Sequence, residues 1–436
     1  MLGLSRCSPG RTAGRSDAGT SKAAEMMAGD AAALPGSASA EAKIAAPPAN
    51  MNVILLTLDS WRADMPWNGY DRPIAPNLSA LAAKGVNYTH AYSLSSYTSM
   101  SLGGLLGGKY PGEMKRDGYF FGHYRGNVLF PERLQAAGVK TFAVHAHLYF
   151  GSAGFERGFD VWKLVPGLKW NAQTDENVTS PRSEKLAEKL LSDPALTGGR
   201  FFAWFHFLDP HDEYKRHSEV PSYGRRLRDL YDGEVTYTDR YIGKLLEFIA
   251  QKPWAANTAI IISGDHGEAF GEHGCWRHGF EIWQPLVRVP WIFVLPGVRA
   301  RTIDLNRSHI DMAPTILELM GVPRDGLEGI SLVPELYETA PPQPRDVIVD
   351  LPRTSNNDRR RAIIHDHYKL IAFGDDTRYQ LFDLDADPEE ERPLNKVDRA
   401  TLTDLVGLYK AKQQGLRDIG PYACRTLEGA PPGRAY

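Results

Sequence analysis

Residues 259–290 carry the densest group of side chains that could do chemistry. An apolar, β-branched run at 259–262 is followed by Asp265 and His266, and His273 and His278 come soon after. A buried parallel strand that ends in this way delivers polar side chains to the edge where α/β sheets keep their active sites. A carboxylate and an imidazole together can bind a divalent metal ion, which leaves further imidazoles to meet a substrate. The alternative is a capped strand end with surface histidines.

A second apolar strand, far away in the sequence, also ends in a carboxylate. The run at 52–58 stops at Asp59. If both strands belong to one parallel sheet, their ends lie at the same edge, and Asp59 is expected beside Asp265 and His266. A single aspartate here could cap the turn, but the three side chains together favour a metal site.

A segment rich in hydroxyl groups precedes a short apolar helix. Residues 93–101 contain five serines and one threonine, and we expect the helix at 102–106. A hydroxyl group at the start of a helix is usually an N-cap. The functional alternative is a nucleophile, for which we choose Thr98, activated by the metal and facing an anionic ester that the helix amides hold.

Two further strands lead to histidines. The run at 139–144 is followed by His147, for which a structural role and a place at the site both remain open. The run at 201–208 contains His206, which we interpret as a core histidine. His211 lies beyond the end of this strand and is the better candidate for proton transfer or anion binding.

The elements between these strands indicate an α/β protein. Residues 223–251 have apolar side chains at helical spacing and are expected to form one or two amphipathic helices packed on the sheet. Further helices are expected at 76–84, 130–137 and 312–320, and further strands at 86–92 and 289–295. We therefore predict a mostly parallel central sheet sandwiched by helices.

The two ends of the chain differ from this central part. Residues 1–50 are rich in Ala, Gly, Ser and Pro and are expected to be a disordered tail before a catalytic domain at 51–335. The region at 340–436 is expected to form a small antiparallel α+β subdomain. Its strands are predicted at 346–350, 361–365, 368–373 and 379–384, and its helix at 399–412.

The composition excludes several classes of protein. A net charge of -3 in 436 residues gives no reason to expect a nucleic-acid partner. Three scattered cysteines do not suggest a disulfide framework. We find no signal peptide and no apolar run long enough to span a membrane, so we expect a soluble chain that is cytoplasmic by default.

Taken together, these landmarks resemble the sulfatase branch of the alkaline phosphatase superfamily. The resemblance runs from residue 52 to about residue 395. It rests on motifs in order, among them NVILLTLDSWRAD, LLGGKYP, HFLDPHDEY, SGDHGEAFGEHG and DMAPTILELMGVP. It implies an alkaline phosphatase-like α/β sandwich with a smaller C-terminal antiparallel domain.

The resemblance also implies roles for individual residues. Three side chains match the positions of metal ligands, namely Asp59, Asp265 and His266. Thr98 falls at the position of the nucleophile. Three histidines match positions that hold the substrate anion or protonate the leaving group, namely His147, His211 and His278.

The sequence departs from the sulfatase pattern at the nucleophile. Sulfatases with a formylglycine nucleophile carry Cys or Ser followed by x-Pro-x-Arg, whereas Thr98 is followed by Ser-Met-Ser-Leu. Threonine cannot become formylglycine, and Ser60 stands where many sulfatases have a second aspartate. Threonine nucleophiles are typical of relatives that act on phosphodiesters, phosphonates, or lipid-linked phosphoglycerol and phosphoethanolamine.

The number of metal ions follows from a similar comparison. Relatives with two metal ions need an additional Asp/His/His set. Asp209, His211 and His278 are candidates, but their spacing does not match closely. We therefore expect one divalent ion, which could be Mn, Zn, Mg or Ca.

We predict a metal-dependent ester hydrolase of sulfatase-like fold with Thr98 as its nucleophile. The substrate would be a small-molecule, glycan-linked or lipid-linked anionic ester, with phosphate or phosphonate preferred to sulfate. Two alternatives remain open at this point. One is a transferase of the phosphoglycerol or phosphoethanolamine type, and the other is a catalytically inactive binding protein of the same fold.

Overall fold

The computed structural model describes residues 47–48, 51–118, 120, 122–123, 126–169, 178–354 and 357–420. Almost all of the tail expected at 1–50 lies outside the described residues. The same is true of the last part of the region expected at 340–436.

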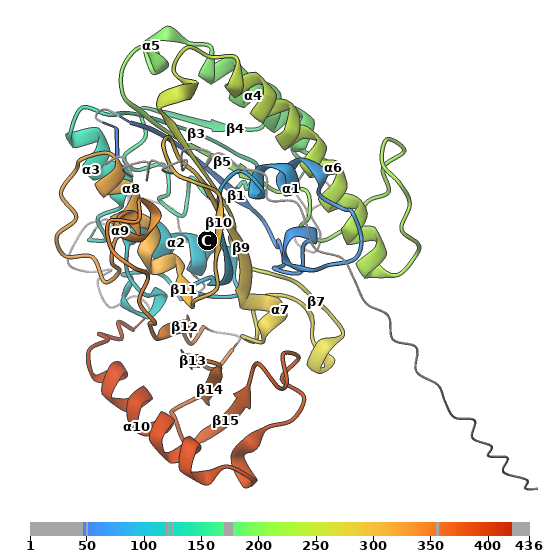
Figure 1. Ribbon diagram of the computed structural model, residues 1–436, viewed down its shortest axis with the longest axis vertical. Helices are drawn as coiled ribbons and strands as arrows, with labels where there is room; N and C mark the ends of the chain where they lie inside the picture. Colours follow the sequence, from blue (N-terminus) through green and yellow to red (C-terminus); the bar gives the residue numbers. More distant parts are fainter. Residues whose placement is uncertain are drawn as a thin grey trace, which may run out of the picture. The chain divides into compact units, whose positions relative to one another are not determined.

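A large mixed sheet forms the centre of the fold (Figure 1). Its strands are β1 (Asn52–Leu58), β2 (Val86–Tyr92), β3 (Lys140–His145), β4 (Val161–Leu164), β5 (Phe201–Phe207), β6 (Thr258–Gly264), β9 (Arg288–Val294), β10 (Arg301–Ile303) and β11 (Arg307–Ser308). The strand order is β10-β2-β9-β6-β1-β5-β3-β4, and β11 pairs with β2. Only the pairs that involve β9 are antiparallel among these described strands. The mostly parallel sheet that the apolar runs predict is confirmed.

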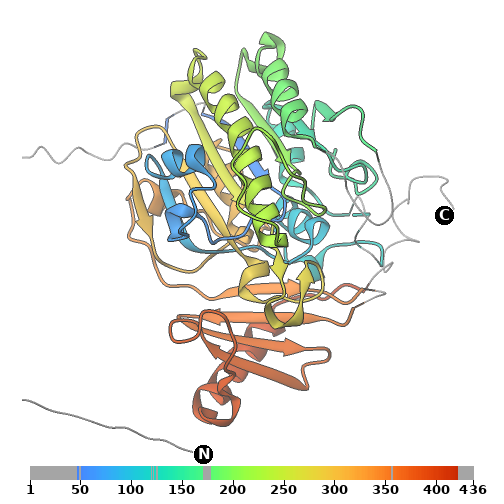
Figure 2. The same cartoon turned by 90° about the vertical axis from the view of Figure 1, so that its right-hand side faces the viewer.

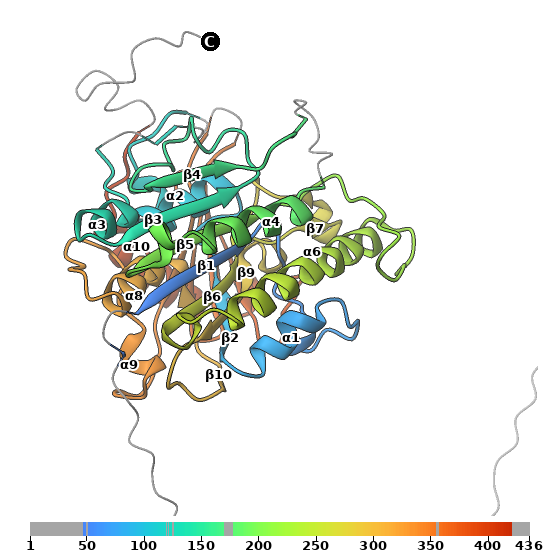
Figure 3. The same ribbon diagram turned by 90° about the horizontal axis from the view of Figure 1, so that it is seen from above.

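Helices cover both faces of this sheet (Figure 3). One face packs against α1 (Pro76–Ala82), α4 (Ser180–Leu191), α5 (Pro194–Thr197) and α6 (Leu227–Ala250). The other packs against α2 (Thr98–Gly107), α3 (Phe130–Ala136), α8 (Met312–Leu319) and α9 (Val333–Leu336). The region expected to form one or two helices at 223–251 is the single helix α6, which buries Tyr231, Val235 and Ile242 on one side.

Short elements follow β6 and lead into β9. The strands β7 (Ala269–Phe270) and β8 (Trp276–Arg277) form an antiparallel hairpin, and α7 (Gln284–Val287) comes after it. This hairpin lies within residues 265–278, the segment in which the sequence places Asp265, His266, His273 and His278.

A second, antiparallel sheet lies in the C-terminal region (Figure 2). It is formed by β12 (Val347–Leu351), β13 (Arg360–His365), β14 (Tyr368–Phe373) and β15 (Arg378–Asp383), in that order. Helix α10 (Arg399–Gln414) packs on one face through Leu405 and Tyr409. The other face packs against side chains of the larger part of the chain, including Tyr92, Met100 and Leu286. The predicted antiparallel sheet and terminal helix are confirmed.

A buried ion pair ties this small sheet to the segment that follows His278. Lys369 on β14 lies 2.7 Å from the carboxylate of Glu390. The same ammonium group donates to the carbonyl of Ile282 at 2.6 Å, and Glu390 accepts from the backbone N–H of Gln284 at 2.6 Å. The small sheet thus fixes the path of the chain between His278 and β9.

Candidate active site

Two carboxylates at the ends of adjacent strands form the base of the candidate site. Because Leu58 of β1 pairs with Gly264 of β6, Asp59 and Asp265 follow at the same level of the sheet edge. Ser60 holds both of them. Its backbone N–H donates to Oδ1 of Asp265 at 3.1 Å, and its hydroxyl donates to Oδ1 of Asp59 at 2.9 Å. The positive φ of Ser60, 54°, allows the sharp turn that this double contact requires.

The two carboxylates are fully buried and have different electrostatic surroundings. Burial raises the pKa of Asp265 well above its ordinary value, and the nearby charge of Asp59 adds to the effect. Burial would also raise the pKa of Asp59, but the imidazoles of His211 and His147 hold it well below its ordinary value. Oδ2 of Asp265 is buried without a hydrogen-bond partner among the described residues. This oxygen is what a bound cation would satisfy.

The ring of His266 has a defined orientation. Nδ1 lies 2.9 Å from the carbonyl oxygen of Gly267, which can only accept, so Nδ1 carries the proton. Burial lowers the pKa of His266 well below its ordinary value, and the ring is neutral. The lone pair on Nε2 therefore faces the hydroxyl of Thr98 at 2.9 Å. Nε2 also lies 3.9 Å from Oδ1 of Asp59 and 3.6 Å from Oδ2 of Asp265.

Helix α2 brings Thr98 to this cluster. The helix expected at 102–106 in fact begins at Thr98 and includes the last part of the hydroxyl-rich segment. Thr98 is the first helical residue and Tyr97 is the N-cap, so the usual capping role does not apply to Thr98. Ser101 donates to the backbone carbonyl of Asp265 at 2.6 Å and locks the helix against the end of β6.

The residues present fit a divalent cation. Asp59, Asp265 and His266 each offer one ligand atom, and these atoms lie within 4.8 Å of one another. A metal-binding histidine commonly donates its other ring N–H to a backbone carbonyl, as His266 does. A cation would also give a partner to Oδ2 of Asp265, which has none among the described residues. The chain therefore contains a buried Asp/His cluster suited to one cation, with the hydroxyl of Thr98 beside it.

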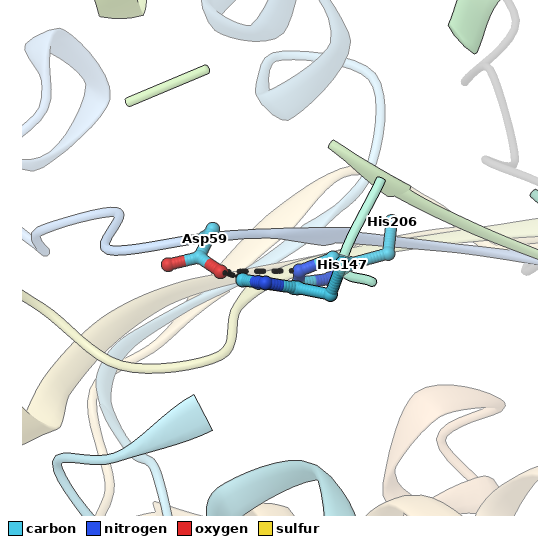
Figure 4. Close-up of side chains that lie close together, drawn as sticks. All are labelled: Asp59, His147 and His206. Atoms are coloured by element: carbon cyan, nitrogen blue, oxygen red, sulfur yellow. Dashed lines mark hydrogen bonds and ion pairs between the residues drawn. The ribbon is translucent and has the colours of Figure 1, made fainter. Parts of the chain in front are cut away.

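Two histidines lie on the far oxygen of Asp59 (Figure 4). Nε2 of His147 is 2.5 Å from Oδ2 of Asp59, and Nε2 of His206 is 3.2 Å from the same oxygen. The interpretation of His206 as a core histidine is therefore incomplete, because the ring is buried but its nitrogen is directed at the site. Its place inside an apolar strand gives no sequence signal that separates the two roles.

His278 is held by Glu268, an acidic residue for which the sequence predicts no role. Nδ1 of His278 lies 3.1 Å from the carboxylate of Glu268, which is buried and accepts a hydrogen bond from the hydroxyl of Tyr214 at 2.7 Å. Burial alone would lower the pKa of His278, but Glu268 and Asp59 offset this, and the pKa is raised above its ordinary value. The position of Glu268, three residues beyond Asp265, is the only signal that could have identified it.

His211 lies between the other two histidines. Nδ1 is 2.8 Å from the backbone carbonyl of Asp212, so it carries a proton and leaves Nε2 for another partner. The centre of the His211 ring is 5.1 Å from that of His278 and 5.9 Å from that of His147. The structure thus brings together all three histidines that the sequence suggested.

The alternative second metal set does not form. Asp209 instead accepts hydrogen bonds from the backbone N–H groups of Thr179 and Ser180 at the start of α4, the latter at 2.7 Å. Both carboxylate oxygens are used in this way. Asp209 therefore has a structural role, and in the described part of the chain it does not belong to a group of ligand atoms close enough to hold a cation.

Two other histidines lie outside the cluster. His145 is buried, with its ring centre 5.3 Å from that of Phe150 and 4.4 Å from that of Trp162. His273, noted in the sequence beside Asp265, instead contacts the backbone carbonyl of Glu389 at 2.8 Å. Neither ring is directed at the two carboxylates.

Comparison with known proteins identifies the family. The sequence profile of the sulfatase family matches residues 51–322. The chain belongs to the sulfatase family. Its C-terminal region, residues 271–416, also matches the profile described as N-sulphoglucosamine sulphohydrolase, C-terminal. The family consists of ester hydrolases within the alkaline phosphatase superfamily, as the motifs implied.

The similar proteins include enzymes for different esters. The chain is 29% identical to the choline-sulfatase of Rhizobium meliloti over 211 residues, which are 45% of this chain and 40% of that protein. It is 25% identical to the ulvan-active sulfatase of Formosa agariphila over 352 residues, 69% of this chain and 68% of that protein. It thus spans less than half of the first relative and about two thirds of the second.

A solved structure supports the fold. The phosphonate monoester hydrolase SpPMH of Silicibacter pomeroyi superposes with a TM-score of 0.70 at 19% identity, covering 88% of this chain and 100% of that one. In the part of the chain that the structure describes, no helix is both long and apolar enough to cross a membrane.

Proposed function

We propose that this sulfatase-family chain is a metal-dependent hydrolase that cleaves a phosphate, phosphonate or sulfate ester with Thr98 as the nucleophile. The observation that carries the proposal is the position of the Thr98 hydroxyl, 2.9 Å from Nε2 of His266. The unpartnered oxygen of Asp265 belongs to the same cluster. A hydroxyl that merely capped a helix would have no reason to face a buried ligand set.

In this proposal, Asp59, Asp265 and His266 hold one divalent cation. When bound, the cation would favour the alkoxide of Thr98 and neutralise charge on a non-bridging oxygen of the ester. Thr98 attacks in line with the leaving group, from the first turn of α2. The backbone N–H groups of that turn have no partners within the helix, and they can donate to the equatorial oxygens.

The histidines would act on the charges that develop during attack. In this proposal His147 and His278 would stabilise the equatorial oxygens, and the raised pKa of His278 favours its protonated form. His211 or His278 would protonate the departing alcohol, which contributes about 10²- to 10⁴-fold in typical enzymes. Water would then release the ester formed on Thr98.

A cleft whose lining includes Asp212 and Arg277, the chain neighbours of His211 and His278, offers room for the organic part of the substrate. It has a volume of about 360 Å³ and is lined by Asp212, Glu213, Tyr214, Leu227, Ala269, Phe270, Trp276 and Arg277. Arg277 pairs with Asp212 at 2.8 Å and precedes His278 in the chain. Aromatic and charged side chains together suit a polar ring or an alcohol better than a long alkyl chain.

The presence of three buried ligand residues, Asp59, Asp265 and His266, favours catalysis over the alternative of an inactive binding protein. A protein that had lost its chemistry would have no need to keep two buried carboxylates at one point, since burying charge without a partner is costly. The phosphonate monoester hydrolase of similar fold is consistent with a phosphorus ester. The sulfatase relatives keep sulfate esters among the candidates.

A panel of aryl sulfate, phosphate monoester, phosphodiester and phosphonate monoester substrates tests the proposal. Each would be assayed with Mn²⁺, Zn²⁺, Ca²⁺, Mg²⁺ and EDTA, for the wild type and for Thr98→Ala. We expect metal-dependent turnover of at least one phosphorus ester that the variant lacks. If the wild type and Thr98→Ala were equally inert with every substrate and bound no metal, the proposal would be wrong.

A further inference from the structure

The carboxylate of Asp59 serves two different sets of side chains. Oδ1 accepts from Ser60 and is the oxygen nearer to His266. Oδ2 instead faces His147 and His206, whose Nε2 atoms lie 2.5 Å and 3.2 Å from it (Figure 4). The two oxygens of one buried group therefore face two separate sets of nitrogen and oxygen donors.

We propose that Asp59, His147 and His206 form a second divalent-cation site, so that Asp59 bridges two ions. The three residues offer one carboxylate oxygen and two imidazole nitrogens within 4.8 Å of one another, and all three are buried. This set of donors suits Zn²⁺ or Mn²⁺. Paired metal sites in phosphoryl-transfer enzymes hold their ions about 3.5–4 Å apart. A single bridging carboxylate can span that distance.

The surroundings of His206 support this assignment. Its partner in the sheet register is Thr57 on β1, and Oγ1 of Thr57 lies 2.7 Å from Nδ1 of His206. The same hydroxyl accepts from the indole N–H of Trp204 at 2.8 Å. Metal-binding histidines typically have their second nitrogen held in this way, which fixes the ring and its tautomer. With Nδ1–H donating to Thr57, Nε2 presents its lone pair to a cation.

The same three residues also have a stable arrangement without a second ion. In that state both Nε2 atoms carry protons, and Oδ2 of Asp59 accepts both hydrogen bonds. Binding of the cation requires each ring to move its proton to Nδ1. This change of tautomer moves a proton between the two nitrogens of one ring and leaves the charge of that ring unchanged. The hydrogen bonds from His147 and His206 to Asp59 are therefore compatible with the second site.

A second ion would change the charge of the site, and this consequence rests on the proposed function. Two divalent cations against the carboxylates of Asp59 and Asp265 leave a net double positive charge. A dianionic phosphate monoester matches this charge better than a monoanionic sulfate ester. The oxyanion-binding role proposed for His147 would then pass to the ion that it holds.

Manganese binding by the full chain tests the second site. Protein stripped with EDTA would be titrated with Mn²⁺, and the bound metal measured by elemental analysis and by electron paramagnetic resonance. We expect two Mn²⁺ per chain, with the exchange-coupled signal of a bridged pair. His206→Gln should bind one Mn²⁺ and give the uncoupled six-line signal.

Two further variants make the result independent of folding defects. His145→Gln changes another buried histidine, the last residue of β3, and this variant should keep both ions. Thr57→Val keeps every ligand but removes the group that orients His206, and it should weaken binding of the second ion about 10- to 100-fold. A folded wild type that binds a single Mn²⁺ with an uncoupled signal would overturn the second site. So would a His206→Gln variant that retains two ions.

The test also separates this inference from the proposed function. If the wild type binds one ion and its turnover still depends on Thr98, only the second site is wrong. If two coupled ions bind but Thr98→Ala retains full turnover, the second site stands and the nucleophile is wrong.

Discussion

The side-chain oxygen of Thr98 lies 2.9 Å from Nε2 of His266, whose other ring nitrogen is occupied by a backbone carbonyl. Replacing Thr98 by valine keeps the shape of the side chain and removes only the hydroxyl. We expect turnover to fall roughly 10⁴-fold or more, as when other enzymes lose a nucleophile. Ser99→Ala is the matched control, because the Ser99 hydroxyl donates to the carbonyl of Phe120 and not into the cluster. Equal losses in both variants would indicate damage to α2 and not loss of a nucleophile.

Removal of metal should destabilise the fold. The unpartnered oxygen of Asp265 and its charge repulsion with Asp59 are both relieved by a cation. At a cation concentration 100 times the dissociation constant, binding adds about 2.7 kcal/mol to the free energy of unfolding. We therefore expect EDTA to lower the melting temperature of the wild type, and to lower that of Asp265→Asn by a smaller amount. Asp350→Asn, which changes a buried carboxylate paired with Arg361, should respond to EDTA as the wild type does.

Loss of His278 should affect esters with poor leaving groups most. Burial opposes the protonated form of His278, but Glu268 and Asp59 outweigh it and raise the pKa, which favours a ring that carries a proton to donate. We expect His278→Gln to slow the hydrolysis of alkyl esters about 10²- to 10⁴-fold. Esters of acidic phenols, which leave without protonation, should lose much less. A loss that does not depend on the leaving group would point to oxyanion binding and away from proton transfer.

The stability of the protein should depend on pH through Glu234 of α6, which contacts His217 in the segment after His211. Burial raises the pKa of Glu234 from 4.5 to about 7, although the nearby His217 opposes this. A raised folded-state pKa means that the group's stabilising effect is complete below about pH 4.5 and is lost as the pH rises through 7. Between these values the wild type should lose about 3 kcal/mol relative to Glu234→Gln. Chemical denaturation at pH 4.5 and pH 8 measures this difference, and parallel curves for the two proteins would contradict the assignment.

The sequence predicts the fold well because its strands are long apolar runs with clear ends. The adjacency of Asp59 and Asp265 follows from the rule that parallel strands end at one edge, and the structure places them there. The sequence predicts the start of α2 too late, because serines and a threonine are poor helix formers in isolation. Tertiary contacts, such as that of Ser101 with the end of β6, hold them in the helix.

Other features of the site have no local signal. The carboxylate of Asp209 caps α4 through residues 29 and 30 positions away, so the sequence alone does not show that it is already hydrogen-bonded. His206 lies among apolar neighbours in β5, and only the register with β1 shows that its ring reaches Asp59. The role of Glu268 can be recognised only in the fold, where the β7–β8 hairpin brings His278 within hydrogen-bond distance of it. Each of these relationships joins parts of the chain that only the tertiary fold brings together.

The direct test of the central claim is to trap the covalent intermediate. The wild-type chain would be mixed with a phosphorus ester that it turns over, quenched in acid within the first turnover, and digested for mass spectrometry. We predict a phosphoryl or phosphonyl group on the peptide that contains Thr98, with fragment ions that place it on that residue. Turnover with no such adduct, or with the adduct on another side chain, would contradict the account.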